Sequence, residues 1–219
     1  MNYLAHAYQY VDDPYFVAGT ALPDWMSVLD RRNRARSQTA QAWIDSDDRQ
    51  LAAMARGVQQ HHADDRWFHQ TEIFARLSTT FAVELRSYLS VGHQAGFLGH
   101  IAVELLLDAV LVEHVPERLD AYYNALSVLE PLRVQTLANS LLTRPVDRLS
   151  LLVPRFIAER FLADYADDQR LWTRLNHVMH RVGLEPLPTS VIDWLASARS
   201  RVRADASQLL AAPIIPPST

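Results

Sequence analysis

Hydrophobic residues recur along the chain mostly at intervals of three and four positions, the spacing that places them on one face of an α-helix. The alternation of apolar and polar residues that is typical of strands is scarce, and only 6 of the 219 residues are glycine. We therefore predict an all-α fold. The predicted helices cover residues 2–10, 38–56, 58–90 (as one helix or two), 97–113, 117–142 (as one helix or a pair), 147–166, 168–182 and 189–210.

Prolines and glycines mark the expected breaks in this pattern. Pro23 directly precedes Asp24, so the backbone that approaches Asp24 is expected to be extended or to begin a helix. Gly57 is expected to interrupt the helical pattern lightly, and the Arg144–Pro145 pair is expected to end a helix.

The length and composition are typical of one globular domain. A chain of 219 residues, 49% of them hydrophobic, can bury a sizeable core, and no internal repeat or low-complexity linker divides it. We expect a single helical domain over residues 1–210, followed by a tail over residues 211–219. The net charge of -4 argues against general nucleic-acid binding, which usually needs a basic surface.

The apolar segments do not predict secretion or membrane insertion. The N-terminal residues lack a basic segment followed by a long apolar stretch, so no signal peptide is expected. The longest apolar run, residues 101–112, is interrupted by Glu104 and Asp108 and is shorter than the roughly 18 apolar residues that span a bilayer. We expect a cytoplasmic protein with no membrane association.

Two residue types are missing from the chain, and their absence narrows the chemistry. Without cysteine, thiol nucleophiles, disulfides, thiolate zinc sites and iron–sulfur clusters are excluded. All 21 basic residues are arginine, so P-loop and Schiff-base lysines are excluded as well. Catalysis must therefore depend on histidine, carboxylate, hydroxyl or arginine side chains, or on a bound ion.

Histidines and carboxylates recur every four residues in the segment HHADDRWFH, residues 61–69. Positions four apart lie one above the other on a helix, so His61, Asp65 and His69 are expected to form one stripe, with His62 beside it. Histidine and carboxylate at this spacing can bind one metal ion together. The alternative is a solvent-exposed helix face with ordinary ion pairs.

The same four-residue step occurs in the segment GHIAVELLLD, residues 99–108, where it aligns His100, Glu104 and Asp108. Their neighbours are almost all apolar. Charged groups on such a helix are costly to bury unless they are paired or bind a metal, so this stripe predicts the lining of a site. A buried hydrogen-bonded pair of His100 with Glu104 is the alternative.

Asp24 and His6 are single residues that could complete a mixed shell of imidazole and carboxylate ligands. Such a shell suits Mn²⁺, Zn²⁺ or iron, whereas an all-oxygen shell suits Mg²⁺ or Ca²⁺. Asp24 could equally be a helix N-cap, and a structural role is favoured for His6. The candidate ligands of one or two ions are Asp24, His61, Asp65, His100, His62 and His6, and the candidate catalytic residues are Glu104 and His69.

Positive charge is concentrated in one short segment, which contains Arg31, Arg32, Arg34 and Arg36. One interpretation is a solvated loop. The other is a docking patch for phosphate or for an acidic partner.

Four short elements occur in order: MNYLAHAY at residues 1–8, GTALPDW at 19–25, GVQQHHADD at 57–65, and GH at 99–100. Together they resemble the acyl carrier protein phosphodiesterase family. That family begins with N-x-L-A-H and continues with G-x-x-x-x-D, then G-[IV]-x-x-H-x-x-x-D, and then a helix that carries a D-H pair. The resemblance covers roughly the first 115 residues and extends to the HD-type metal-dependent phosphohydrolases.

The resemblance implies an HD-like orthogonal helix bundle that hydrolyses a phosphodiester, with acyl carrier protein phosphopantetheine as a candidate substrate. It implies a metal role for Asp24, His61, Asp65 and His100. The chain departs from the family where His69 takes the place of an aspartate, which makes the expected site richer in histidine.

Other functions remain open alongside this resemblance. The histidine-rich H-x-x-x-E pattern is also similar to the zinc-dependent phospholipase C and single-strand nuclease superfamily. A non-catalytic helical binding module and an iron-containing, oxygen-handling protein of the HD type are further alternatives. The leading prediction is a metal-dependent phosphoester hydrolase, in which the ion activates water and Glu104 or a histidine such as His69 is the general base.

Overall fold

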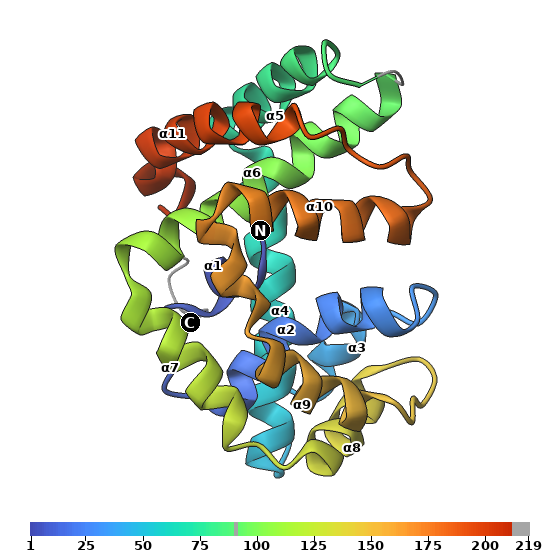
Figure 1. The fold of residues 1–219 in the computed structure, drawn as a ribbon. Coiled ribbons are helices and arrows are strands. Elements are labelled where there is room, and N and C mark those ends of the chain that lie inside the picture. The colour runs from blue at the N-terminus through green and yellow to red at the C-terminus, as the bar shows by residue number, and fades with distance from the viewer. Residues whose placement is uncertain (90–91, 212–219) are drawn as a thin grey trace. The chain divides into compact units, whose positions relative to one another are not determined.

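The computed structural model describes residues 1–89 and 92–211, and the regular structure in these ranges is helical throughout (Figure 1). The all-α prediction is therefore confirmed. The α-helices are α1 (Tyr3–Ala7), α2 (Pro14–Leu29), α3 (Ser37–Gln41), α4 (Arg49–Gln70), α5 (Glu72–Leu85), α6 (Gly92–His114), α7 (Pro116–Ser127), α8 (Pro131–Leu141), α9 (Leu149–Glu159), α10 (Asp168–Val182) and α11 (Val191–Leu209). A 3₁₀-helix, η1 (Phe161–Ala166), follows α9.

Helix α4 does not break where the sequence predicts. The expected interruption at Gly57 is wrong, because the helix continues through it. The break comes instead at Thr71, whose hydroxyl oxygen accepts a hydrogen bond from the N–H of Phe74 and caps α5. The expected helix pair over residues 117–142 is observed as α7 and α8.

Two further helices differ in length from the prediction. The helix expected over residues 147–166 ends at Glu159, where Arg160 adopts a left-handed backbone conformation with a φ of 42°. The helix expected over residues 97–113 is observed as α6, which begins more than one turn earlier, at Gly92. Helices α10 and α11 lie close to where the sequence predicts them.

Helix α2 runs through Pro23, so the prediction that Asp24 follows extended backbone or begins a helix is wrong. The helix begins at Pro14, where the carboxylate of Asp13 accepts a hydrogen bond from the N–H of Phe16. Pro23 has no N–H to donate and weakens the hydrogen bonding of the turn before it. Asp24 is therefore an interior residue of the helix and not an N-cap.

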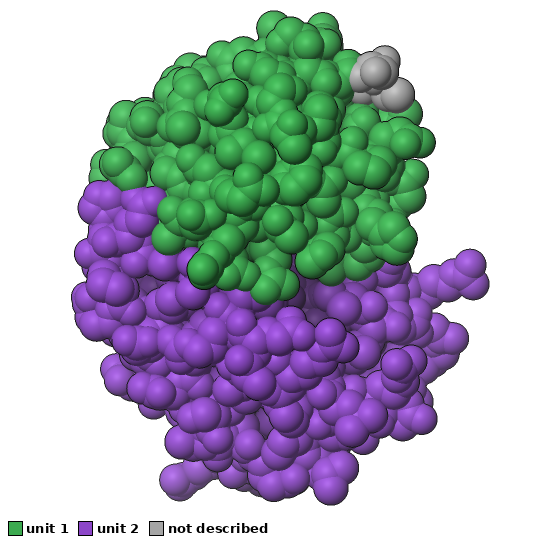
Figure 2. Space-filling model, in the orientation of Figure 1, with its two compact units in different colours: residues 1, 66–110, 164–219 green, residues 2–65, 111–163 purple. Residues whose placement is uncertain are grey.

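The chain divides into two compact units, which Figure 2 colours separately. Unit 1 comprises residue 1, residues 66–110 and the residues from 164 onward, and unit 2 comprises residues 2–65 and 111–163. Unit 2 contains α1, α2, α3, α7, α8, α9 and most of α4, while unit 1 contains the end of α4, α5, most of α6, α10 and α11. The single domain expected over residues 1–210 stays a prediction, and residues 212–219 of the expected tail lie outside the described residues.

The core of unit 2 is built around an aromatic cluster. The ring of Phe156 in α9 lies 5.0 Å from that of Tyr3 in α1 and 5.6 Å from that of Trp25 in α2, centroid to centroid. Tyr122 of α7 meets the same ring edge-on at 6.4 Å. Such aromatic pairs contribute about 0.5–1.5 kcal/mol each beyond the burial of their surface. They fix α1 and α2, which each supply one side chain to the candidate site.

Helices α2 and α4 of unit 2 approach so closely that only glycine fits where they touch. A Cβ atom on Gly19 would lie 2.2 Å from the carbonyl oxygen of Met54, and one on Gly57 would lie 2.2 Å from the carbonyl oxygen of Phe16. Both obstacles are backbone atoms, which cannot rotate out of the way. The glycines of the G-x-x-x-x-D and G-[IV]-x-x-H elements therefore form the contact between the two helices.

Unit 1 packs α5 against α11 on one side and against α6 on another. The ring of Phe81 is edge-on to Trp194 with centroids 5.2 Å apart, and the carboxylate of Glu84 accepts hydrogen bonds from Trp194 Nε1 and from both terminal nitrogens of Arg201. Gly99 allows α6 to approach α5, because a Cβ atom there would lie 2.7 Å from backbone atoms of α5. This contact sets the position of His100, the next residue of α6.

Helix α6 is long and apolar enough to cross a membrane by length and composition alone. However, 78% of its most apolar window is buried inside the protein. Burial of this kind is typical of the core helix of a soluble protein. The two carboxylates that interrupt its apolar run, Glu104 and Asp108, are buried as well.

Candidate functional site

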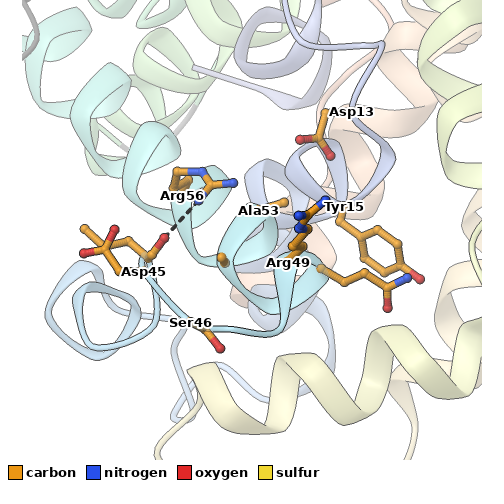
Figure 3. Close-up of a pocket in the computed structure, with 10 residues that line it drawn as sticks. Asp13, Tyr15, Asp45, Ser46, Arg49, Ala53 and Arg56 are labelled. Atoms are coloured by element: carbon orange, nitrogen blue, oxygen red, sulfur yellow. Dashed lines mark hydrogen bonds between the residues drawn. The ribbon is translucent and has the colours of Figure 1, made fainter.

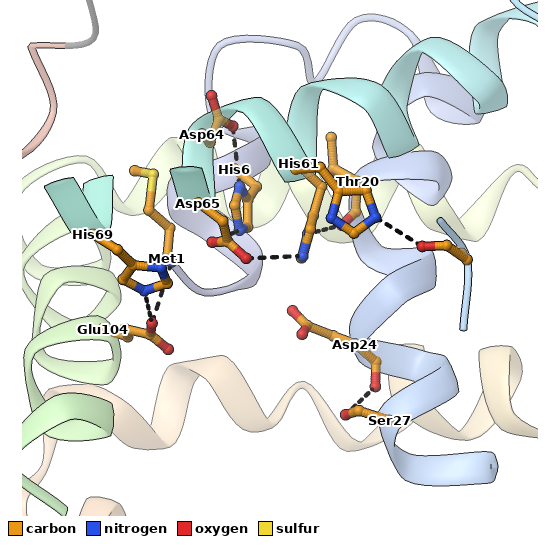
Figure 4. Close-up of polar contacts among 12 residues, drawn as sticks. Met1, His6, Thr20, Asp24, Ser27, His61, Asp64, Asp65, His69 and Glu104 are labelled. Atoms are coloured by element: carbon orange, nitrogen blue, oxygen red, sulfur yellow. Dashed lines mark hydrogen bonds and ion pairs between the residues drawn. The ribbon is translucent and has the colours of Figure 1, made fainter. Parts of the chain in front are cut away.

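His61 of α4 is held in one orientation by helix α2. Its Nδ1 lies 2.9 Å from the carbonyl oxygen of Thr20, in the turn of α2 that Pro23 weakens. A carbonyl oxygen can only accept, so Nδ1 donates to it and Nε2 is the other ring nitrogen. That Nε2 lies 3.4 Å from Oδ2 of Asp65 and is the atom available to a metal (Figure 4).

His6 of α1 is oriented by a carboxylate instead of a carbonyl. Its Nδ1 donates to Oδ2 of Asp64 at 3.0 Å, and Gln60 Nε2 donates to the other oxygen of Asp64 at 2.6 Å. The Nε2 of His6 is buried, has no hydrogen-bond partner among the described residues, and lies 3.3 Å from Oδ1 of Asp65. Metal-binding histidines commonly use this arrangement, with one ring nitrogen donating to a carboxylate and the other facing the ion.

The surroundings of His6 keep a proton on its ring when no metal is bound. Burial opposes the charged imidazolium, but the hydrogen bond to Asp64 and the carboxylate of Asp65 outweigh burial and raise the pKa of His6 to about 9. Burial alone would raise the pKa of Asp65, yet its contacts with His6 and His61 hold it well below the usual range. A metal ion would place its positive charge at the same point and would displace the proton of His6 on binding.

Three potential ligand atoms therefore converge in unit 2. The imidazoles of His6 and His61 stack with their centroids 4.1 Å apart. The ligand atoms of His6, His61 and Asp65 all lie within 4.8 Å of one another. We call this group the His-His-Asp cluster. Since metal–nitrogen and metal–oxygen bonds are about 2.0–2.2 Å long, small side-chain movements would bring all three atoms onto one ion.

Asp24 of α2 points toward the His-His-Asp cluster (Figure 4). Its Oδ2 is buried and accepts no hydrogen bond from the described residues. Burial raises the pKa of Asp24, and the nearby His61 and His6 only partly offset this. A buried carboxylate oxygen without a donor is costly, and a cation is the partner that would satisfy it. Asp24 is therefore a fourth candidate ligand.

His62 makes a different contact from its neighbour His61. Its Nε2 donates to the carbonyl oxygen of Ala35 at 2.8 Å, and burial lowers the pKa of the ring. This hydrogen bond ties α4 to the arginine-rich loop, residues 30–36. His62, expected from the sequence as a ligand, is engaged with this loop and does not belong to the group of converging ligand atoms.

A second cluster lies in unit 1, between the end of α4 and α6. The Nε2 atoms of His69 and His100 lie 2.7 and 3.3 Å from the same oxygen of Glu104, Oε1. The ligand atoms of these three residues also lie within 4.8 Å of one another. The ring of Phe74 contacts both imidazoles, with centroids 4.8 and 4.9 Å away. We call this group the His-His-Glu cluster.

Glu104 remains ionised in spite of its burial. Burial would raise its pKa, but the α-amino group of Met1, 3.4 Å from Oε1, and the imidazoles of His100 and His69 hold the pKa well below the usual range. The side chain of Glu104 is 11% exposed, whereas that of His100 is 47% exposed. The His-His-Glu cluster is therefore accessible from solvent on the side of His100.

The residues that the sequence singles out fall into two sets. His6, Asp24, His61 and Asp65 lie together in unit 2, and His69, His100 and Glu104 lie together in unit 1. The sequence favours a structural role for His6, yet its Nε2 is one of the converging atoms. The sequence also gives no role to Asp64, although Gln60 and Asp64 are four residues apart on α4, the spacing of a side-chain hydrogen bond.

A cleft of about 600 Å³ also lies in unit 2, but the His-His-Asp cluster does not line it (Figure 3). Its charged lining residues are Asp13, Asp45, Arg49 and Arg56. Arg56 donates to the carbonyl oxygen of Ile44 at 2.9 Å. Because two carboxylates balance the two guanidinium groups, the cleft has no net charge that would attract a phosphate.

Both clusters combine imidazole nitrogen with carboxylate oxygen, a donor set that suits divalent transition-metal ions. The buried oxygen of Asp24, which accepts no hydrogen bond in the part of the chain that the structure describes, and the buried Nε2 of His6, which faces Asp65, support such a group in the His-His-Asp cluster. No family model matches the chain, and searches of curated proteins and of solved structures return no match.

Proposed function

We propose that the protein is a metal-dependent phosphoester hydrolase whose catalytic ion is bound by the His-His-Asp cluster and Asp24. The observation that carries this function is the convergence of the Nε2 atoms of His6 and His61 on the carboxylate of Asp65, beside the unpaired oxygen of Asp24. Two nitrogen and two oxygen donors suit Mn²⁺, Zn²⁺ or Fe²⁺.

The chain's own contribution is to hold these ligands in a fixed geometry. The carboxylate of Asp64 and the carbonyl oxygen of Thr20 each accept a hydrogen bond from Nδ1 of one imidazole. Both Nε2 atoms therefore face the carboxylate of Asp65. A bound divalent ion would lower the pKa of a water ligand and neutralise charge on the phosphoryl oxygens. Four protein donors leave positions for water and substrate on a five- or six-coordinate ion.

The arginine-rich loop is the candidate binding surface for the anionic substrate. Its four exposed arginines are Arg31, Arg32, Arg34 and Arg36. The buried Asn33 anchors the loop, because it donates to the carbonyl oxygen of Arg144 at 2.7 Å. Guanidinium groups bind phosphate oxygens through paired hydrogen bonds. His62, the neighbour of His61 on α4, donates to the carbonyl oxygen of Ala35 in this loop. The loop is therefore attached to α4 next to a ligand of the His-His-Asp cluster.

The substrate class follows from the same features. A phosphodiester carries the single negative charge and the non-bridging oxygens that arginines and a divalent ion recognise. The four family-like elements favour a phosphopantetheine diester on acyl carrier protein as the substrate. An acidic carrier protein would also complement the positive charge of the arginine-rich loop.

The test combines metal analysis with a generic phosphodiester assay. The full chain, purified without added chelator, is expected to contain bound transition metal by elemental analysis and to hydrolyse bis(4-nitrophenyl) phosphate. Asp65→Asn and His61→Ala are expected to lose the ion of the His-His-Asp cluster and to reduce hydrolysis by about 100-fold or more. Asp12→Asn, an exposed carboxylate of the same unit, is the control and should match the wild type.

Two results would contradict this function in different ways. Full metal content in both cluster variants would refute the metal site. Bound metal without hydrolysis of any phosphodiester would refute the reaction and leave the metal site in place.

A further inference from the structure

Three donor groups crowd around one oxygen atom in unit 1. Oε1 of Glu104 lies 2.7 Å from Nε2 of His69, 3.3 Å from Nε2 of His100 and 3.4 Å from the α-amino group of Met1. A carboxylate oxygen offers two lone pairs, so three donors cannot all align with it well. A shared cation relieves this crowding, because the imidazole nitrogens and the carboxylate oxygen then all face the ion.

Both imidazoles of this cluster are free to present Nε2 to a metal. Packing against Phe74 holds the two rings, and no hydrogen bond to either Nδ1 occurs within the described chain. A neutral ring of His69 or His100 can therefore place its proton on Nδ1 and leave the lone pair on Nε2. Glu104, ionised and buried, supplies the negative charge that a divalent ion needs.

We propose that the His-His-Glu cluster is a second metal site, which binds its own divalent transition-metal ion through His69, His100 and Glu104. The ion is additional to the one in the His-His-Asp cluster of unit 2. His69 and Glu104, which the sequence favours as catalytic residues, are then ligands instead of general bases. This second site does not depend on the protein being a hydrolase.

The second site is expected to bind its ion more weakly than the first. In the His-His-Asp cluster, each imidazole donates from Nδ1 to a fixed acceptor, and Asp24 adds a fourth donor. The His-His-Glu cluster has neither feature. Since outer hydrogen-bond partners typically change metal affinity by 10–100-fold, a difference of about this size or larger is expected.

The donor atoms also determine which ions the second site accepts. Two imidazoles and one carboxylate suit Zn²⁺ or Co²⁺, whereas Mg²⁺ and Ca²⁺ prefer oxygen ligands. Three protein ligands leave at least one coordination position open on a four-coordinate ion. His100 is the exposed member, so exchange with solvent is expected through its side of the cluster.

The test is a metal titration of the full chain after its metal has been removed. Zn²⁺ binding is measured by calorimetry, and Co²⁺ binding by visible absorption, both in excess Mg²⁺. The wild type is expected to bind two ions per chain in two phases. His100→Ala should lose the weaker phase and keep the tighter one, while Asp65→Asn should do the reverse. His93→Ala removes an exposed histidine of the same helix and should keep both phases.

Three results would overturn the second site. They are a single ion per wild-type chain, two ions in the folded His100→Ala variant, and loss of both ions from that variant. Glu104→Gln and His69→Ala are each expected to remove the same phase as His100→Ala, so the outcome does not depend on the folding of one variant. Two bound ions without phosphodiester hydrolysis would support this site and refute the proposed function.

Discussion

Gly19 and Gly57 meet where helices α2 and α4 touch, and neither position has room for a Cβ atom. His61 follows one turn after Gly57 on α4, and Asp24 lies just over one turn beyond Gly19 on α2. The close contact allows Nδ1 of His61 to reach the carbonyl oxygen of Thr20 at 2.9 Å. The two glycines therefore position the ligands that follow them and have no chemical role of their own.

Gly57→Ala is expected to destabilise the protein by about 3 kcal/mol, measured as the free energy of unfolding in urea. The new methyl group would lie 2.2 Å from the carbonyl oxygen of Phe16, so α2 and α4 would have to separate. Metal content should fall as well, because the separation moves Asp24 away from His61. Gly96→Ala is the matched control. Gly96 is an exposed helical glycine, and a Cβ atom added there would have no neighbouring atom within 4 Å. The alanine should therefore stabilise the protein by up to about 1 kcal/mol.

Asp24→Asn is expected to change stability and metal binding in opposite directions. Burial raises the pKa of Asp24, so between the ordinary value of 3.8 and the raised value the folded protein binds more protons than the unfolded chain. Stability of the metal-free protein therefore falls as the pH rises through this window. Asparagine cannot ionise, so the variant does not lose this stability. The Tm of the metal-free variant should therefore exceed that of the wild type at neutral pH, whereas below pH 3.8 it should not.

The same variant should bind metal more weakly, because the amide oxygen of asparagine carries no charge. Calorimetric titration with Zn²⁺ measures this second effect. A metal-free variant less stable than the wild type at neutral pH would show that the carboxylate of Asp24 has a stabilising partner in the fold.

Glu84→Gln is expected to lower the free energy of unfolding by about 1 kcal/mol at pH 7, a modest value because the side chain is 35% exposed. The hydrogen bonds from Arg201 lower the pKa of Glu84, and that from Trp194 adds to this. The contribution of Glu84 is therefore complete above its ordinary pKa of 4.5 and is lost as the pH falls through the lowered value.

Urea unfolding at pH 7 and at pH 3 tests this dependence. The difference between Glu84→Gln and the wild type should shrink at the lower pH. Glu185→Gln alters an exposed carboxylate that forms no hydrogen bond or ion pair in the described chain, and it should show no such change. An equal loss for Glu84→Gln at both pH values would contradict the ionic origin of the effect.

Most of the helices and the pairing within each polar stripe could be predicted from the sequence because they depend on local spacing, whereas α2 was not expected and the helix expected over residues 38–56 is observed only as α3 and the start of α4. His61 and Asp65 are one turn apart, and so are His100 and Glu104, and each pair is in contact in the structure. The helical period of 3.6 residues alone brings such pairs onto one face.

Several structural details that the sequence failed to predict depend on contacts between helices. Pro23 and Gly57 are helix breakers by local propensity, yet packing of α2 against α4 retains both within helices. His6, for which the sequence favours a structural role, turns its Nε2 toward Asp65 because Asp64, far along the chain on α4, orients its ring. The sequence also aligns His69 with His61 and Asp65, whereas in the structure His69 lies with His100 and Glu104.

Paired substitution of Arg34→Gln and Arg36→Gln should raise KM for an anionic phosphodiester by about 10-fold and leave kcat and metal content unchanged. Both guanidinium groups are exposed, and neither forms an ion pair with the described residues, so they remain available to phosphate oxygens. Arg155→Gln is the matched control. It removes an exposed arginine of the same unit that pairs with Glu159 at 2.7 Å, and its KM should equal that of the wild type. Equal KM values for the paired variant and the control would exclude the arginine-rich loop from substrate binding, whereas a fall in kcat would place these arginines at the reacting phosphate.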